Sequence, residues 1–171
     1  MAQFAKIVPH LWFPDQVEEA ARFYVGIFPQ SRLESVTAIP ADTPSGPAGS
    51  VKVVEFTLAG QPFLAIGAGP LDPFNHAISL LVTCEDQAEI DRYWDGLLAG
   101  GGKPEEGGWL RDRYGLAWQI VPARFGEMMA DPDRARAKRV TDAMLKMVKF
   151  DIAALEAAYS GTGAANARAQ R

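Results

Sequence analysis

Two segments with a similar pattern lie about 70 residues apart in the chain, and this internal similarity is the strongest constraint on its fold. PDQVEEAARFY begins at Pro14 and EDQAEIDRYW begins at Glu85, each directly after an apolar run. Similarity at this spacing is typical of a duplicated supersecondary unit whose copies bury their sheet faces. The sequence therefore predicts two copies of one unit.

The first half has the pattern of a βαβββ unit. An apolar segment over 4–13 predicts a strand, and apolar side chains recur at helical spacing after Pro14. Further strands are expected at 32–39, 51–58 and 62–66, the last two as a hairpin. The helix is expected to bury one stripe of side chains, which consists of Val17, Ala20, Ala21, Tyr24 and Phe28.

The second half repeats this order and ends in two short strands. An apolar strand is expected over 76–84, followed by a helix whose buried stripe includes Ile90, Tyr93, Trp94, Leu97 and Leu98. The stretch 107–122, GGWLRDRYGLAWQIVP, then predicts two strands joined by a turn at 112–115. Because strand side chains alternate, Gln119 shares a face with Ala117 and Val121. A buried amide needs partners, so Gln119 either closes a structural hydrogen bond or faces a ligand cavity.

The chain beyond Pro122 is predicted to be helical. Asp131 and Pro132 supply a helix start before an apolar stripe that consists of Val140, Ala143, Met144, Met147 and Val148. Asp151 is expected to cap a second short helix. The predicted organisation is one domain over 4–159, with a first module at about 4–67, a second at about 76–122 and a helical extension at about 123–159. Residues 160–171 are expected to be disordered.

Composition restricts the possible partners and the compartment. The 171-residue chain has a net charge of −4, which provides no basic surface for nucleic acid. No apolar run approaches the roughly 20 residues that a membrane span requires, and the start lacks the layout of a secretory signal. The single cysteine, Cys84, fits a reducing compartment and is expected to be a buried structural thiol. These features favour a cytoplasmic protein.

Three segments together resemble a known family: FPDQVEEAARFYVGIFPQS after the first strand, VEFTLAGQPFLAI in the hairpin, and GGWLRDRYGLAWQIVP. The chain resembles the PhnB-like branch of the vicinal-oxygen-chelate superfamily, which includes glyoxalases, bleomycin-resistance proteins and extradiol dioxygenases. This resemblance implies an α+β fold of paired βαβββ modules with a C-terminal helical extension, and a homodimer. Members of the branch are often described as demethylubiquinone methyltransferases. We do not expect that activity, because the sequence has no glycine-rich loop between a strand and a helix for a nucleotide-containing methyl donor.

The resemblance also implies candidate metal ligands. Enzymes of the superfamily hold a divalent metal on strand residues of both modules, and His10, His76 and Gln119 match such positions. Gln119 stands where those enzymes usually carry glutamate, and His10 is shifted towards the following helix. Two imidazoles and an amide form a neutral set, which should hold zinc, manganese, iron or nickel weakly. Glu55 could supply the missing charge and serve as a base. The alternative is that these side chains are structural or solvated.

Two classes of function follow from this resemblance. The first is binding of a small planar ligand in a β-sheet cup lined by Trp12, Trp109 and Trp118. The second is a metal-dependent lyase, isomerase, dioxygenase or thiol transferase that acts on a small substrate with adjacent oxygens. The incomplete ligand set favours the first class. Neither class requires a membrane or a nucleic acid.

Overall fold

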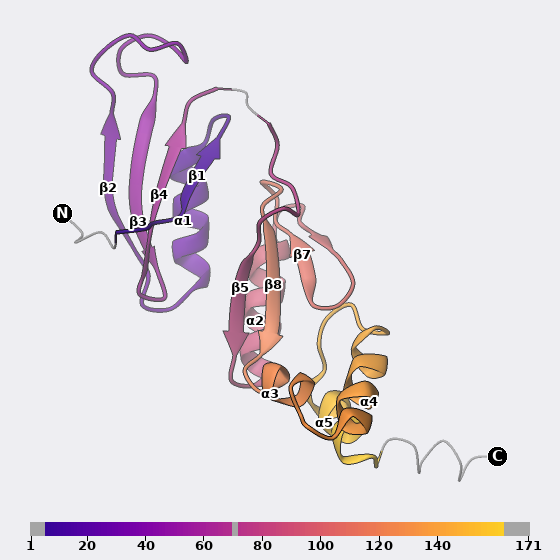
Figure 1. Ribbon diagram of the computed structural model, residues 1–171. Coiled ribbons are helices and arrows are strands. Elements are labelled where there is room, and N and C mark those ends of the chain that lie inside the picture. The colour runs from indigo at the N-terminus through magenta and orange to yellow at the C-terminus, as the bar shows by residue number, and fades with distance from the viewer. Residues whose placement is uncertain (1–5, 70–71, 163–171) are drawn as a thin grey trace. The chain divides into compact units, whose positions relative to one another are not determined.

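The chain divides into two compact units, Met1–Pro73 and Phe74–Arg171. The computed structural model describes residues 6–69 and 72–162 (Figure 1). The two residues Phe4 and Ala5, with which the first predicted strand begins, and most of the C-terminal segment predicted to be disordered lie outside the described residues.

The first unit contains one helix and a four-stranded sheet. Its elements are β1 (His10–Phe13), α1 (Val17–Ile27), β2 (Arg32–Ala38), β3 (Lys52–Leu58) and β4 (Gln61–Gly67). The strand order is β1-β4-β3-β2, in which β1 pairs with β4 in parallel and the other pairs are antiparallel. Helix α1 packs on one face of this sheet (Figure 1).

The core of the first unit forms between α1 and this sheet face. All five side chains of the predicted helix stripe are buried, and Tyr24 stacks on Phe56 of β3, which in turn stacks on Phe63 of β4. The β3–β4 hairpin turns through Ala59 and Gly60, both of which have positive φ. Such backbone angles match the twist of paired strands, so the predicted hairpin is confirmed.

The first strand is shorter than the predicted segment 4–13. It begins at His10, and residues 6–9 form no strand. Pro9 lacks a backbone N–H and pairs only through its carbonyl, which accepts from Leu64 N at 3.0 Å. The apolar side chain of Ile7 is 86% exposed. The strand predicted from the apolar residues of 4–13 was therefore too long at its N-terminal end.

The second unit repeats the same arrangement and adds three helices. Its elements are β5 (Leu80–Cys84), α2 (Gln87–Leu98), β6 (Lys103–Pro104), β7 (Trp109–Arg111), β8 (Ala117–Pro122), α3 (Phe125–Met129), α4 (Arg134–Met144) and α5 (Ile152–Ser160). The strand order β5-β8-β7-β6 corresponds position by position to that of the first unit. The α+β class, the paired βαβββ units and the helical extension are thus confirmed.

Two boundaries in the second unit differ from the sequence prediction. Strand β5 begins at Leu80, and His76 lies in a turn that precedes it. His76 is therefore not part of the strand that the sequence predicted over 76–84. Helix α4 is capped by Asp133 rather than Asp131 and ends at Met144, so Met147 and Val148 do not continue its stripe.

The residues after α4 instead form backbone hydrogen bonds with the two glycines that precede β7. Gly107 N donates to Met147 O and Gly108 N donates to Val148 O, each at 2.8 Å. Asp151 then caps α5 as predicted, because its side chain accepts from Ala154 N at 2.9 Å. The extension is therefore part of the second unit and shares its core through Phe150 and Leu155, which are buried.

Candidate functional site

The first unit presents three predicted site residues on the sheet face opposite α1. His10 and Trp12 are the exposed residues of β1, and they alternate with the buried Leu11 and Phe13. His10 pairs with Leu64 of β4, and Leu64 pairs with Glu55 of β3. Because paired residues project to the same face, His10 and Glu55 share one row across the sheet. These two predicted residues thus lie on the same sheet face, with Leu64 of β4 between them.

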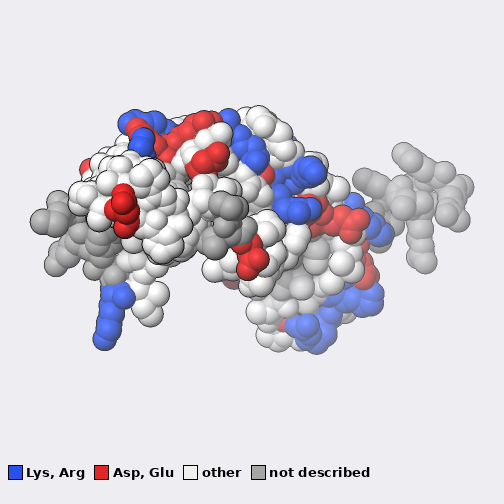
Figure 2. All heavy atoms as spheres, turned by 90° about the horizontal axis from the view of Figure 1, so that it is seen from above, with Lys and Arg blue, Asp and Glu red and all other residues white. Residues whose placement is uncertain are grey.

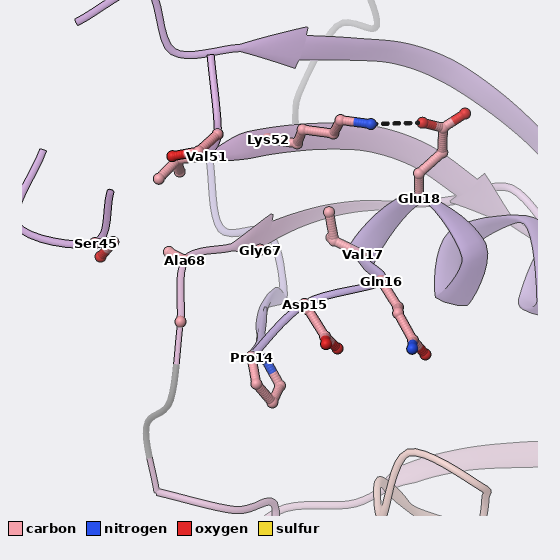
Figure 3. Close-up of a pocket in the computed structure, with 12 residues that line it drawn as sticks. Pro14, Asp15, Gln16, Val17, Glu18, Ser45, Val51, Lys52, Gly67 and Ala68 are labelled. Atoms are coloured by element: carbon pink, nitrogen blue, oxygen red, sulfur yellow. Dashed lines mark hydrogen bonds and ion pairs between the residues drawn. The ribbon is translucent and has the colours of Figure 1, made fainter. Parts of the chain in front are cut away.

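A separate pocket of about 330 Å³ lies beside the start of α1 (Figure 3). The side chains of Asp15, Glu18 and Lys52 provide its charges, and Lys52 pairs with Glu18 at 3.4 Å. None of the predicted site residues lines this pocket. The pairing of Lys52 lowers the positive charge that it could offer to a ligand.

In the second unit, the turn between β7 and β8 is built around Asp112. Gly115 N donates to Asp112 O at 2.9 Å, and the side-chain Oδ1 accepts from Tyr114 N at 2.9 Å and Leu116 N at 3.1 Å. The indole Nε1 of Trp118 donates to the other carboxylate oxygen at 2.8 Å. Trp118 is only 2% exposed. Its ring belongs to the core and leaves no open face for ligand stacking, unlike the expectation from the resemblance.

The opposite face of β8 carries Gln119, which pairs directly with Trp109 of β7. The Gln119 amide donates to Ser79 Oγ at 2.7 Å. Side chains of such cross-strand pairs lie within contact distance. Gln119 therefore combines both alternatives left open by the sequence, because it makes a structural hydrogen bond and also lines a pocket beside Trp109.

This pocket has a volume of about 360 Å³. Residues of β7, β8 and the segment before β7 form one side, and residues of the extension form the other. The lining residues are Glu106, Gly107, Trp109, Gln119, Val121, Phe125, Met144, Leu145 and Phe150. Most of these side chains are apolar, and Glu106 is the one charged side chain among them. The volume and composition are those of sites for small organic molecules.

His76 contacts the ring of Trp109, which lines this pocket. The two ring centroids are 5.8 Å apart and the planes are tilted by 53°. His76 Nε2 is 2.6 Å from Glu105 Oε2, and Arg111 Nε donates to Glu105 Oε1 at 2.7 Å. Burial alone would raise the pKa of Glu105, but the hydrogen bonds from His76 and Arg111 outweigh it and hold that pKa below its ordinary value.

Sequence reasoning missed several residues of this region. Glu105 was not identified as the partner of His76, and Phe125 and Phe150 were not assigned to a binding surface. Glu105 is 29 residues from His76 in the chain, and no spacing rule connects them. The sequence signal for a close contact in this region was the glycine pair Gly107 and Gly108. Both residues have positive φ, and their lack of a side chain allows the extension to approach closely.

The predicted metal ligands do not make a metal site within either unit. No group of three or more His, Cys, Asp or Glu side chains in the described residues is placed to hold a metal ion. His10 and Glu55 belong to the first unit and His76 and Gln119 to the second, and the Nε2 atom of His76 is engaged by Glu105. The donors of each unit taken alone do not fit a divalent metal, which needs number, charge and geometry together.

Cys84 is fully buried at the end of β5, as predicted from the sequence. Burial, together with the charge of Glu89, raises the pKa of its thiol to about 12. A thiol with this pKa is protonated at neutral pH and reacts slowly. Cys84 is therefore a structural residue rather than a nucleophile.

Charged side chains of both signs are interspersed on the face drawn in Figure 2. In the extension, Arg124 pairs with Glu156 at 2.8 Å and Lys138 pairs with Asp142 at 2.6 Å. These two basic residues thus lie next to acidic ones. Within the described ranges, no helix has both the length and the apolar character that crossing a bilayer requires.

Comparisons with known proteins identify the family. A sequence model of the family described as 3-demethylubiquinone-9 3-methyltransferase matches residues 5–121. A PhnB protein from Bacillus cereus, described as a 3-demethylubiquinone-9 3-methyltransferase, is 33% identical, and the match covers 70% of this chain and 100% of that chain with a TM-score of 0.61. A comparison with curated proteins gave no match.

Two fosfomycin resistance proteins share the fold at lower identity. FosX from Mesorhizobium loti is 15% identical over 77% of this chain and 100% of that chain, with a TM-score of 0.53. A mutant FosX from Listeria monocytogenes, in complex with Mn(II) and 1S,2S-dihydroxypropylphosphonic acid, is 15% identical over 71% of this chain and 93% of that chain, with a TM-score of 0.51. The matched family model and the 33% identical PhnB protein lead to one conclusion: the chain belongs to the 3-demethylubiquinone-9 3-methyltransferase family, the PhnB-like branch of the vicinal-oxygen-chelate superfamily.

Proposed function

We propose that the protein binds a small planar organic ligand in the pocket beside Trp109 and Gln119. The observation that carries this proposal is the pocket itself, in which an indole, an amide and two phenyl rings line about 360 Å³. An aromatic ring contributes a flat apolar surface, and a single amide orients a bound molecule by hydrogen bonding. Trp12 and Trp118 are not part of this proposal, because neither lines the pocket.

The charge of the pocket favours a neutral or cationic ligand. None of the described Lys and Arg residues lines it, and Glu106 contributes an exposed carboxylate to the lining. An acidic ligand would lose hydration without gaining a cationic partner. A ligand with a positive charge would instead gain a modest attraction of about 1 kcal/mol near the surface.

Binding of three related probes tests this proposal by calorimetry. Quinoline and N-methylquinolinium should bind, and the anionic quinaldate should bind more weakly. Trp109→Ala should weaken quinoline binding about tenfold or more, since it removes the main aromatic surface. Trp12→Ala is the matched control, because it removes an indole from the first unit, and it should have little effect. Equal affinity of the wild type and Trp109→Ala for all three probes would refute the proposed site.

Methyl transfer is not part of the proposed function. The connections from β1 to α1 and from β5 to α2 are residues 14–16 and 85–86, and neither contains glycine. Rossmann-type nucleotide sites use a glycine-rich turn there for close approach to the backbone. We therefore leave methyl transfer out of the proposal.

A metal-dependent reaction is the second candidate. The observation in its favour is the contact between His76 and Glu105, because metal-bound histidines commonly donate their other ring N–H to a carboxylate. The neutral Gln119 counts against it. Elemental analysis after expression with Zn, Mn, Fe or Ni should give less than one equivalent per chain. Stoichiometric metal that is lost in His76→Ala would favour the metal-dependent class, and Gln119→Glu should then raise the metal affinity.

We also propose that the protein is a cytoplasmic homodimer. The exposed apolar side chains Ile78 and Leu81 of the second unit support this, because exposed apolar groups are common where subunits meet. The single cysteine is compatible with a reducing compartment. Sedimentation that shows only an 18.5 kDa species at micromolar concentration would contradict the dimer.

A further inference from the structure

We infer that the C-terminal extension selects the ligand, with Leu145 and Met144 as the specificity-determining side chains of the pocket. This inference rests on the proposed function. The family match ends at residue 121, and the PhnB protein from Bacillus cereus is covered completely by 70% of this chain. Trp109 and Gln119 lie inside the matched range, whereas Phe125, Met144, Leu145 and Phe150 lie after it. One wall of the pocket thus lies beyond the range that the family model matches.

On one side, the backbone of this wall is hydrogen-bonded to the two glycines that precede β7. Gly107 N and Gly108 N donate to the carbonyls of Met147 and Val148. A Cβ at Gly108 would lie 2.6 Å from Phe150 Cε2 and 2.9 Å from Ile120 O. Only glycine allows this approach, and its φ of +81° also favours glycine. The local sequence is therefore suited to seating the extension here.

A second attachment comes from helix α2. Gln87 Nε2 donates to Phe150 O at 3.1 Å, and Ile152 N donates to Gln87 Oε1 at 3.0 Å. Lys149 also pairs with Asp91 of α2 at 2.7 Å. These bonds hold the segment that follows Leu145 from two sides. A wall with a fixed backbone can discriminate ligands by shape, because it does not simply move away from a larger one.

The side chains of the wall divide into a packed part and an open part. Phe150 is 2% exposed and packs against Phe125 with centroids 5.1 Å apart, so it supports the wall. Leu145 is 67% exposed although it lines the pocket. Its backbone is fixed, and its exposed apolar side chain lines the same pocket as Trp109. A bound ligand would cover this apolar surface. Leu145 can therefore be changed with little effect on the core.

Two probes of different size test this inference by calorimetry: quinoline, with two fused rings, and acridine, with three. Leu145→Ala and Met144→Ala should weaken the binding of quinoline by about fivefold, because apolar contact area is lost. Leu145→Trp should exclude acridine and retain quinoline. Val148→Ala is the matched control, because Val148 is exposed in the same segment and does not line the pocket. It should bind both probes as the wild type does.

The results separate this inference from the proposed function. Thermal unfolding followed by circular dichroism should first establish that each variant folds. If Trp109→Ala weakens binding while Leu145→Ala, Met144→Ala and Leu145→Trp bind both probes like the wild type, the extension does not select the ligand and the proposed function stands. If Trp109→Ala has no effect either, both the proposed function and this inference are overturned.

Discussion

The indole N–H of Trp118 donates to the buried carboxylate of Asp112 at 2.8 Å, and this bond ties the β7–β8 turn to the strand that leaves it. Asp112 is 4% exposed and its carboxylate also accepts from the backbone N–H groups of Tyr114 and Leu116. A buried carboxylate that accepts several hydrogen bonds is a structural group. The bond thus assigns Trp118 to the framework and leaves Trp109 as the tryptophan of the pocket.

Asp112→Ala should destabilise the protein by roughly 2–4 kcal/mol, because several N–H donors lose their acceptor in a buried turn. Trp118→Phe removes one of these donors and should cost less. Urea unfolding followed by far-ultraviolet circular dichroism measures both, without relying on tryptophan fluorescence. A change of less than about 0.5 kcal/mol for Asp112→Ala would show that the turn does not need this carboxylate.

Gln87→Ala should destabilise the protein by roughly 1–3 kcal/mol, since it removes hydrogen bonds to the backbone of Phe150 and Ile152. Hydrogen exchange should show reduced protection over residues 147–152. Gln61→Ala is the matched control, because the Gln61 amide donates only to the adjacent Pro62 carbonyl in the described contacts. Unchanged protection in Gln87→Ala would mean that the extension is held by other contacts.

The cluster of Glu105 with His76 and Arg111 should make stability depend on acid pH. The folded-state pKa of Glu105 is lowered despite its burial, because His76 and Arg111 donate to its carboxylate. Its contribution is therefore complete above the unfolded pKa and is lost as pH falls through the lower folded pKa. The stability advantage of the wild type over Glu105→Gln should be present at about pH 6 and shrink below about pH 4.5. Glu106→Gln, which changes the exposed neighbour, should show no such trend.

Cys84 should react with a thiol reagent only after unfolding. A pKa of about 12 leaves about one thiolate in ten thousand at pH 8, and the sulfur is buried. Labelling by Ellman's reagent should be slow in buffer and rapid in concentrated urea. Rapid stoichiometric labelling of the native protein at pH 8 would contradict the assigned environment.

The sequence by itself determined the repeated units and the composition of their cores. The helix stripe containing Tyr24 is buried as predicted, and so are Ile90, Tyr93, Trp94 and Leu97 of the second stripe, because helical periodicity is a local property that packing preserves. Leu98, at the end of that stripe, is only half-buried. The alternation of Trp118 and Gln119 was also correct, since side chains of a strand project to opposite faces. Hairpin turns could be predicted because glycine and aspartate specify local backbone geometry.

Only the tertiary structure decided which side chains form the pocket and what His76 contacts. Glu105 meets His76, Gln119 meets Ser79, and Met147 and Val148 pair with Gly107 and Gly108 instead of continuing a helix. These contacts join residues far apart in the chain, and periodicity carries no information about them. The end of α4 at Met144 has the same cause. Backbone hydrogen bonds to Gly107 and Gly108, just before β7, compete with those of a longer helix, and the apolar pattern cannot predict which set forms.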